Sequence, residues 1–216
     1  MLCLRKRPDK YSKKAKHEGY RSRAAYKLLQ ITKKFNLFHE HQTVIDLCGA
    51  PGGFSQIARD QTDGRAKIFL IDLARVKPIP NITEIIKGDI TKLTTIRRLQ
   101  ESLEQSGAHK NEIIVLSDCS PNVSGHWATD HARQVYLAEV SLGIANYFLA
   151  DKFLTKVFQG EYLEELMRKI RTFYHNVKVF KPPTSRKQSA ETYIIATKRK
   201  DIEMIQHNQN YLILDE

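Results

Sequence analysis

The sequence contains no long hydrophobic run. No stretch approaching the roughly 20 apolar residues of a membrane-spanning helix occurs among its 216 residues. The N-terminal stretch MLCLRKRPDKYSKKAKHEGY also lacks the apolar core, followed by small residues, that a secretory signal needs. We therefore expect a soluble, cytoplasmic protein with no membrane partner.

Cysteine is scarce, at three residues. Cys3, Cys48 and Cys119 lie too far apart for a C-x-x-C metal or redox pair, and their odd number suits a reducing compartment. His126 and His131 have no metal-ligand partners at a typical spacing, so we assign them to a loop and a helix cap. The sequence predicts neither a disulfide nor a bound metal.

Acidic residues are few where basic residues gather. The chain carries 35 Lys and Arg against 24 Asp and Glu, a net charge of +11. Residues 1–34 hold twelve basic residues and two acids, and residues 178–200 hold seven and one. This segregation favours a polyanionic partner, because phosphates release counterions when they bind Lys and Arg.

The N-terminal region divides into a tail and a helix. In residues 20–35 the apolar side chains recur near helical spacing, at Ala25, Leu28, Leu29, Ile31 and Phe35. This pattern predicts a docked helix with a basic outer face. Residues 1–19 form a basic tail, although a disordered stretch that only aids solubility is an equally good interpretation of residues 1–15. We expect one catalytic domain over residues 20–200 and a short tail over residues 201–216.

Strand-like apolar runs alternate with helical patterns along the rest of the chain. The predicted strands cover residues 43–47, 67–72, 83–88, 112–118, 151–158, 176–181 and 191–197. The predicted helices cover about 53–61, 92–106, 131–149 and 161–173. This alternation predicts an α/β fold with a mostly parallel sheet covered on both faces. Only PPTSRKQSA separates the last two strands, so the final strand should be antiparallel to its predecessor.

Three glycines and a proline follow the first strand in VIDLCGAPGGFSQIARD. Residues 46–54 lie at the carboxyl end of that strand, where open α/β sheets bind ligands. Gly49, Gly52 and Gly53 permit a tight turn and the close approach of a flat ligand. A turn with only a packing role is the alternative. Pro51 replaces the second glycine of the dinucleotide fingerprint, and G-x-x-x-x-G-K-[ST] is absent, which argues against a pyrophosphate ligand.

Acidic residues end the next two strands. Asp72 can accept hydrogen bonds from vicinal ribose hydroxyls, and Asp89 can meet the exocyclic amine of an adenine. Each alone would be an ordinary loop acid. Together with the glycine turn they predict a nucleoside pocket, and without a phosphate-binding motif the natural ligand is S-adenosyl-L-methionine.

Six segments then identify a family resemblance. YRSRAAYKLLQI, VIDLCGAPGGFSQIA, GDI, LSDCSPNVSG, FLTKVFQG and SAETYIIATKRK occur in this order over about residues 10–200. Through them the chain resembles the FtsJ-type (RrmJ-like) RNA ribose 2′-O-methyltransferases. The resemblance implies a seven-stranded, Rossmann-like S-adenosylmethionine-dependent methyltransferase fold. It also implies a catalytic set of Lys27, Asp118, Lys156 and Glu191. The cofactor contacts that it implies fall on Gly53, Phe54, Asp72, Asp89 and Asp118.

The catalytic set also makes chemical sense without the family. Methyl transfer from a sulfonium to a hydroxyl requires positioning of the reactants and removal of a proton. Lys156 interrupts an otherwise apolar strand, where an unpaired ammonium would be costly. Burial or the neighbouring cation Lys27 could make it a general base, with Asp118 and Glu191 orienting the two lysines. A lone lysine at a strand edge would instead extend into solvent.

The loop that begins at Asp118, DCSPN, argues against two other methyl acceptors. Enzymes that methylate adenine N6 place an aromatic after Asp/Asn-Pro-Pro, where this chain has Asn122. The covalent cytosine C5 route places Pro before its Cys, whereas Asp118 precedes Cys119. We therefore predict S-adenosylmethionine-dependent methylation of a ribose 2′-hydroxyl in RNA.

The target RNA has two interpretations. SDCSPNVSGHWATDHAR and KVFQG resemble the ribosomal RNA large subunit methyltransferase E group, so a uridine of large-subunit ribosomal RNA is predicted, with the tRNA anticodon loop as the alternative. A non-catalytic RNA-binding module with the same fold is a further alternative. Loss of a catalytic residue would have favoured it, but all four are present. Pro51 argues against a nicotinamide dehydrogenase. We expect a monomer, and the sequence does not specify an accessory subunit.

Overall fold

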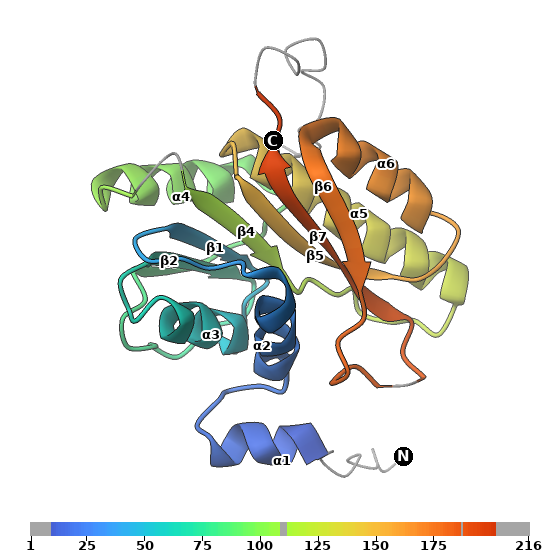
Figure 1. The fold of residues 1–216 in the computed structure, drawn as a ribbon, viewed down its shortest axis with the longest axis horizontal. Coiled ribbons are helices and arrows are strands. Elements are labelled where there is room, and N and C mark those ends of the chain that lie inside the picture. The colour runs from blue at the N-terminus through green and yellow to red at the C-terminus, as the bar shows by residue number, and fades with distance from the viewer. Residues whose placement is uncertain (1–9, 109–111, 187, 202–216) are drawn as a thin grey trace.

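The computed structural model describes residues 10–108, 112–186 and 188–201, and it contains one seven-stranded sheet (Figure 1). The strand order is β3-β2-β1-β4-β5-β7-β6. The strands are β1 (Thr43–Leu47), β2 (Lys67–Asp72), β3 (Glu84–Lys87), β4 (Ile113–Ser117), β5 (Lys152–Phe158), β6 (Tyr174–Phe180) and β7 (Glu191–Arg199). Neighbouring strands are parallel except that β7 runs antiparallel to both β5 and β6. The predicted α/β fold with an antiparallel last strand is confirmed.

Six helices lie among the described residues, and those of the predicted domain cover both faces of the sheet (Figure 1). They are α1 (Lys10–His17), α2 (Ala24–Phe35), α3 (Gly53–Gln61), α4 (Leu93–Gln105), α5 (Trp127–Tyr147) and α6 (Leu163–Phe173). Apolar residues of α2 and α3 share one core cluster, and those of α4, α5 and α6 share the other. The central strands β1 and β4 are buried at every position because helices cover them on both sides.

Helix α5 begins earlier than predicted. The sequence assigned His131 to the helix cap, but the helix starts at Trp127 with His126 at the N-cap. Asp130 fixes this start, because its carboxylate accepts hydrogen bonds from the backbone N–H groups of Ser124 (2.8 Å) and Gly125 (3.0 Å). His131 therefore lies in the second turn and is buried.

Part of the basic N-terminal stretch is a helix that packs on the domain. The Tyr11 ring of α1 lies 5.7 Å from the Tyr26 ring of α2, and the Tyr20 ring lies 5.8 Å from Tyr26. Ala15 is buried. Residues 10–17 are thus ordered, whereas residues 1–9 and 202–216 of the predicted tails lie outside the described residues. No helix in the described part of the chain is long and apolar enough to cross a membrane.

Candidate active site

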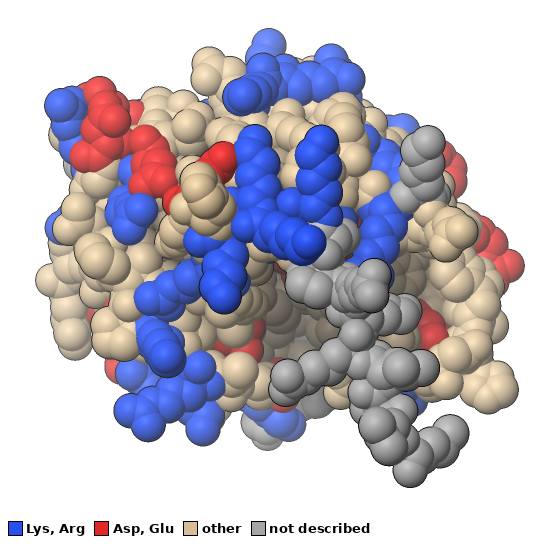
Figure 2. Space-filling view, turned by 90° about the horizontal axis from the view of Figure 1, so that it is seen from below, with Lys and Arg blue, Asp and Glu red and all other residues tan. Residues whose placement is uncertain are grey.

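The predicted site residues meet where the parallel strands end. Figure 2 views the molecule from this side, and Lys and Arg side chains gather along one side of a hollow there. The ends of β1, β2, β4 and β5 contribute to this edge, together with the first residue of β7 and the helix α2. The carboxyl ends of parallel strands share one edge, so segments far apart in the sequence are brought together.

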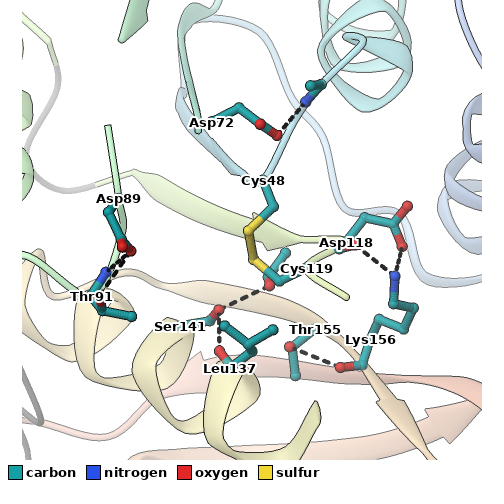
Figure 3. Close-up of a disulfide and its surroundings, with 12 residues drawn as sticks. Cys48, Asp72, Asp89, Thr91, Asp118, Cys119, Leu137, Ser141, Thr155 and Lys156 are labelled. Atoms are coloured by element: carbon teal, nitrogen blue, oxygen red, sulfur yellow. Dashed lines mark hydrogen bonds and ion pairs between the residues drawn. A yellow bond between two sulfur atoms is a disulfide. The ribbon is translucent and has the colours of Figure 1, made fainter. Parts of the chain in front are cut away.

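Lys156 and Asp118 form a buried ion pair at the ends of β5 and β4 (Figure 3). The Lys156 Nζ donates to Asp118 Oδ1 (3.1 Å) and to the Asp118 backbone carbonyl (2.6 Å). Lys156 is only 5% exposed. Lys156 therefore turns inward and is paired, as the cost of burying an ammonium demands, and does not extend into solvent as a lone strand-edge lysine would.

Lys27 and Glu191 form a second ion pair beside the first. Lys27 lies on α2, and Glu191 is the first residue of β7. Their side chains are 10% and 16% exposed. The Ser185 hydroxyl also donates to Glu191 Oε1 (3.4 Å). The structure thus brings all four predicted catalytic residues to one edge, as two ion pairs.

Tyr193 joins the two pairs, and the sequence analysis missed it. Its hydroxyl donates to Asp118 Oδ1 (2.7 Å) and lies 3.4 Å from Glu191 Oε1. It is opposite Lys156 in the β5–β7 register and is fully buried. Burial and the two carboxylates raise the pKa of Tyr193 well above its usual value, so the phenol stays protonated and donates. The sequence did contain a signal for Tyr193. It lies two residues after Glu191 on a predicted strand, and side chains two residues apart on a strand share one face.

The charge state of Asp118 follows from its neighbours. Burial alone would raise the pKa of this carboxyl. The charges of Lys156 and Lys27 and the hydrogen bonds from Tyr193 and Lys156 outweigh burial and hold the pKa below its usual value. Asp118 is therefore a carboxylate at neutral pH.

Two further acids, Asp72 and Asp89, lie at the same edge of the sheet, at the ends of β2 and β3. Asp72 ends β2 and accepts hydrogen bonds from the backbone N–H groups of Ala50 (2.9 Å) and Ala74 (2.7 Å), so it fixes the glycine turn. Asp89 Oδ1 accepts from the backbone and hydroxyl of Thr91 (2.9 and 2.8 Å). No hydrogen bond to Asp89 Oδ2 occurs within the described residues, so this oxygen can accept from an adenine amine. These carboxylates fit the nucleoside part of S-adenosyl-L-methionine.

The glycine turn packs against protein on the side where a side chain would project. Gly52 has a φ of +112° and is the N-cap of α3. A Cβ there would overlap Ile79, and one at Gly53 would overlap the Ser22 hydroxyl. Phe54 is 2% exposed, and its ring lies 6.3 Å from that of Tyr193. Both Gly53 and Phe54 thus lie beside the site, with Phe54 in the core beneath it.

Comparison with known proteins decides the family. A model described as FtsJ-like methyltransferase matches residues 20–199. The chain belongs to this family. It is therefore an S-adenosyl-L-methionine-dependent methyltransferase.

Curated relatives and a solved structure agree with this assignment. Ribosomal RNA large subunit methyltransferase E of Methanococcoides burtonii is 43% identical over 196 residues, which cover 90% of this chain and 71% of the relative. The protein of the same name from Archaeoglobus fulgidus is 39% identical over 201 residues, 92% of this chain and 100% of the relative. A crystal structure described as a ribosomal RNA methyltransferase from Plasmodium falciparum has a TM-score of 0.71 at 24% identity. It covers 83% of this chain and 98% of that chain, and it supports the fold.

The prediction of no disulfide is wrong for this FtsJ-like chain. Cys48 and Cys119 are bonded, with their Cα atoms 5.0 Å apart (Figure 3). Strands β1 and β4 are parallel neighbours with Leu47 in register with Ser117, so Cys48, the first residue after β1, lies close to Cys119, the second residue after β4. The spacing argument excluded only sequence-local pairs, and this pair is 71 residues apart. The bond connects the start of the glycine turn to the residue after Asp118.

A further carboxyl, Asp46, is fully buried beneath the glycine turn. Its Oδ2 accepts a hydrogen bond from the Ser55 hydroxyl (2.6 Å), and Oδ1 is among the buried atoms with no partner. Burial is the largest cause that raises the pKa of Asp46 to about 7; the Ser55 hydrogen bonds oppose it, and the charges of Asp118 and Asp72 add to it. Asp46 therefore changes charge near neutral pH.

Proposed function

We propose that this methyltransferase modifies a ribose 2′-hydroxyl in RNA, and specifically a uridine of large-subunit ribosomal RNA. The observation that carries the proposal is the buried network of Lys27, Asp118, Lys156 and Glu191 at the ligand edge of the sheet. The names of the relatives support the ribosomal target.

The reaction needs a cofactor site beside a proton acceptor. S-adenosyl-L-methionine, when bound, supplies a methyl group on a sulfonium. Asp72 and Asp89, at the ends of β2 and β3, would hold its ribose and adenine beside the turn that contains Gly53. A cofactor held there would leave the Lys156 side of the edge for the hydroxyl that is methylated, because in-line displacement needs both groups aligned.

Lys156 removes the proton of the 2′-hydroxyl. Its ammonium first loses a proton to solvent, and the neutral amine then accepts the hydroxyl proton as the methyl group is transferred. Asp118 holds the Lys156 nitrogen in place through two hydrogen bonds. Glu191 holds Lys27, and the cation at Lys27 favours the developing negative charge on the ribose oxygen.

RNA binds across the basic surface that surrounds the site. Lys and Arg gather along one side of the hollow on this face (Figure 2). Exposed lysines of α1 add to this surface, at Lys10, Lys13, Lys14 and Lys16. Such contacts neutralise phosphates without reading bases, so they position the RNA but do not select the nucleotide. We propose that the protein acts in the cytoplasm as a monomer.

Incubation with methyl-labelled S-adenosyl-L-methionine tests this function. The purified chain is mixed with large-subunit ribosomal RNA, with large ribosomal subunits or with tRNA, and the RNA is digested to nucleosides. We expect label in 2′-O-methyluridine from ribosomal RNA, and about 10²–10⁴-fold slower labelling with the matched variant Lys156→Ala. Label from the tRNA anticodon loop alone would favour the tRNA alternative. Binding without transfer would favour the non-catalytic module, and label on a base would contradict the proposal.

A further inference from the structure

Four aromatic rings form a cluster at the carboxyl end of β5. They are Trp127 and His131 of α5, Phe158 at the end of β5 and Tyr162 just before α6. The Trp127 ring stacks on His131 (5.5 Å between centroids, 11° between planes) and on Phe158 (6.1 Å, 22°). His131 in turn stacks on Tyr162 (5.3 Å, 29°). The two ring contacts hold the indole in one defined orientation at the carboxyl end of β5 and leave about half of Trp127 exposed (53%).

The cluster adjoins the catalytic network. Phe158 lies two residues after Lys156 on β5 and is in register with Glu191 of β7. Two residues span about 7 Å along a strand, close to the width of one nucleotide base. Gln134, in the same stretch of α5 as His131, donates hydrogen bonds to the carbonyl oxygens of Cys119 (3.1 Å) and Lys156 (3.0 Å). The helix that carries the indole is therefore fixed directly to the catalytic strand.

The aromatic cluster is buried at His131 and exposed to solvent at Trp127. His131 is 1% exposed, and a Cβ at Gly160 would overlap its ring, so the chain closes tightly over this imidazole. Trp127 above it is 53% exposed. A residue with only a packing role would be buried, because leaving an aromatic surface of this size in water is unfavourable in free energy. We therefore interpret the exposed Trp127 indole as a flat surface that a ligand can contact.

We propose that Trp127 stacks on the base of an unpaired nucleotide beside the target ribose. This inference rests on the proposed function and names a positioning residue for its RNA. A 2′-hydroxyl can align with the cofactor only where the strand is locally unpaired, and unpaired bases of RNA stack readily on aromatic side chains. The basic surface around the site holds phosphates but cannot fix the rotation of a ribose. A stacked neighbouring base supplies that constraint.

The surroundings favour an uncharged base at Trp127 and a supporting role for Tyr162. Tyr162 is 40% exposed, but the nearby Glu161 and Glu165 raise the pKa of its phenol, Glu161 chiefly through a hydrogen bond. These carboxylates would repel a phosphate at that end of the cluster. The nucleotide therefore stacks at the Trp127 and Phe158 end, next to Lys156.

The sequence offers a direct probe, because Trp127 is the single tryptophan of the chain. Its fluorescence is measured while a short single-stranded oligoribonucleotide is added to the full chain, and binding is followed separately by filter retention. We expect the emission to be quenched as the base stacks. Unchanged emission at saturating RNA would overturn the inference, whether or not methyl transfer occurs.

Kinetics of variants give a second test. Trp127→Leu keeps apolar bulk but removes the π face, and Trp127→Phe keeps a smaller ring. With ribosomal RNA as substrate, Trp127→Leu should raise KM for RNA about 5- to 150-fold, the loss of one base–aromatic stack. Trp127→Phe should recover much of that loss, and the affinity for S-adenosyl-L-methionine should not change in either variant.

A matched control separates stacking from folding. Tyr147→Ala removes an aromatic that is 38% exposed at the far end of the same helix, and it should leave KM for RNA unchanged. Thermal unfolding of each variant checks that the fold is retained. If Trp127→Leu folds and keeps the wild-type KM, the inference is wrong even though the proposed function stands. If wild-type protein transfers no methyl group to RNA, the proposed function fails instead.

Discussion

The Tyr193 hydroxyl connects the two ion pairs, so Tyr193→Phe is an incisive test of the network. The variant removes one oxygen from a fully buried side chain and keeps the ring that packs against Phe54. It removes the 2.7 Å hydrogen bond to Asp118 Oδ1. Asp118 then keeps Lys156 but loses its neutral donor.

The expected loss follows from the energetics of hydrogen bonds to charged groups. Such a bond contributes about 1.5–3 kcal/mol, so the free energy of unfolding should fall by about 2 kcal/mol. For a chain of this length that corresponds to a fall in Tm of about 4–8 °C. Because the lost hydrogen bond favours the ionised form, the pKa of Asp118 rises toward its ordinary value. Stability from Asp118 ionisation is present above the unfolded-state pKa and is lost as pH falls, so the variant should lose stability at a higher pH than wild type.

The assay compares Tyr193→Phe with Tyr174→Phe. Tyr174 is also buried, and its hydroxyl donates to the Ala150 carbonyl (2.8 Å) on a different part of the sheet. Both variants should lower Tm, but only Tyr193→Phe should also lower kcat, by about tenfold, because the Asp118 carboxylate that pairs with Lys156 loses a hydrogen bond that orients it. Equal kcat values for the two variants would refute the role of Tyr193 in the site.

Three further predictions concern the cofactor, the RNA and pH. Asp72→Ala should weaken S-adenosyl-L-methionine binding in calorimetry by at least about tenfold, since it removes a hydrogen-bond acceptor and releases Ala50; unchanged affinity would contradict the site. Replacing Lys13 and Lys16 by Gln should reduce the slope of log affinity for RNA against log salt by about 1.4, and an unaltered slope would show that α1 does not contact RNA. The folded-state pKa of Asp46 is raised to about 7, so its burial costs stability as pH rises from about 4 to 7. Asp46→Asn removes this cost, and its stability relative to wild type in denaturant should increase over that range; a constant difference would show that Asp46 does not titrate there.

The sheet could be predicted largely from local patterns, because a parallel α/β fold leaves a strong signal in the sequence. Predicted and observed strands agree to within about two residues at each end, and α3 agrees at both ends. The short PPTSRKQSA connection correctly predicted an antiparallel last strand. The insertion of β7 between β5 and β6 was not predicted, because pairing order is a long-range property that a local pattern does not encode.

The positions of candidate site residues could be predicted where a strand end carries a distinctive residue, and contacts that cross the sheet were missed. Asp72 and Asp89 follow from the rule that ligands bind at strand ends. The Cys48–Cys119 bond and the hydrogen bond from Tyr193 to Asp118 depend on strand register, which spacing alone does not reveal. His131 was assigned to a cap because the cap signal of Asp130 lies in the first turn of the helix instead of before it.

Single-turnover methyl transfer by Lys156→Arg tests most directly whether Lys156 is the general base. Arginine retains a positive charge beside Asp118 but does not lose its proton in proteins, so it can position a hydroxyl and cannot accept its proton. The variant should fold, bind S-adenosyl-L-methionine as wild type does and transfer the methyl group about 10²–10⁴-fold more slowly, as should Lys156→Ala. A Lys156→Arg rate close to that of wild type, with chemistry shown to be rate-limiting, would contradict the account and leave Lys156 as a fixed cation.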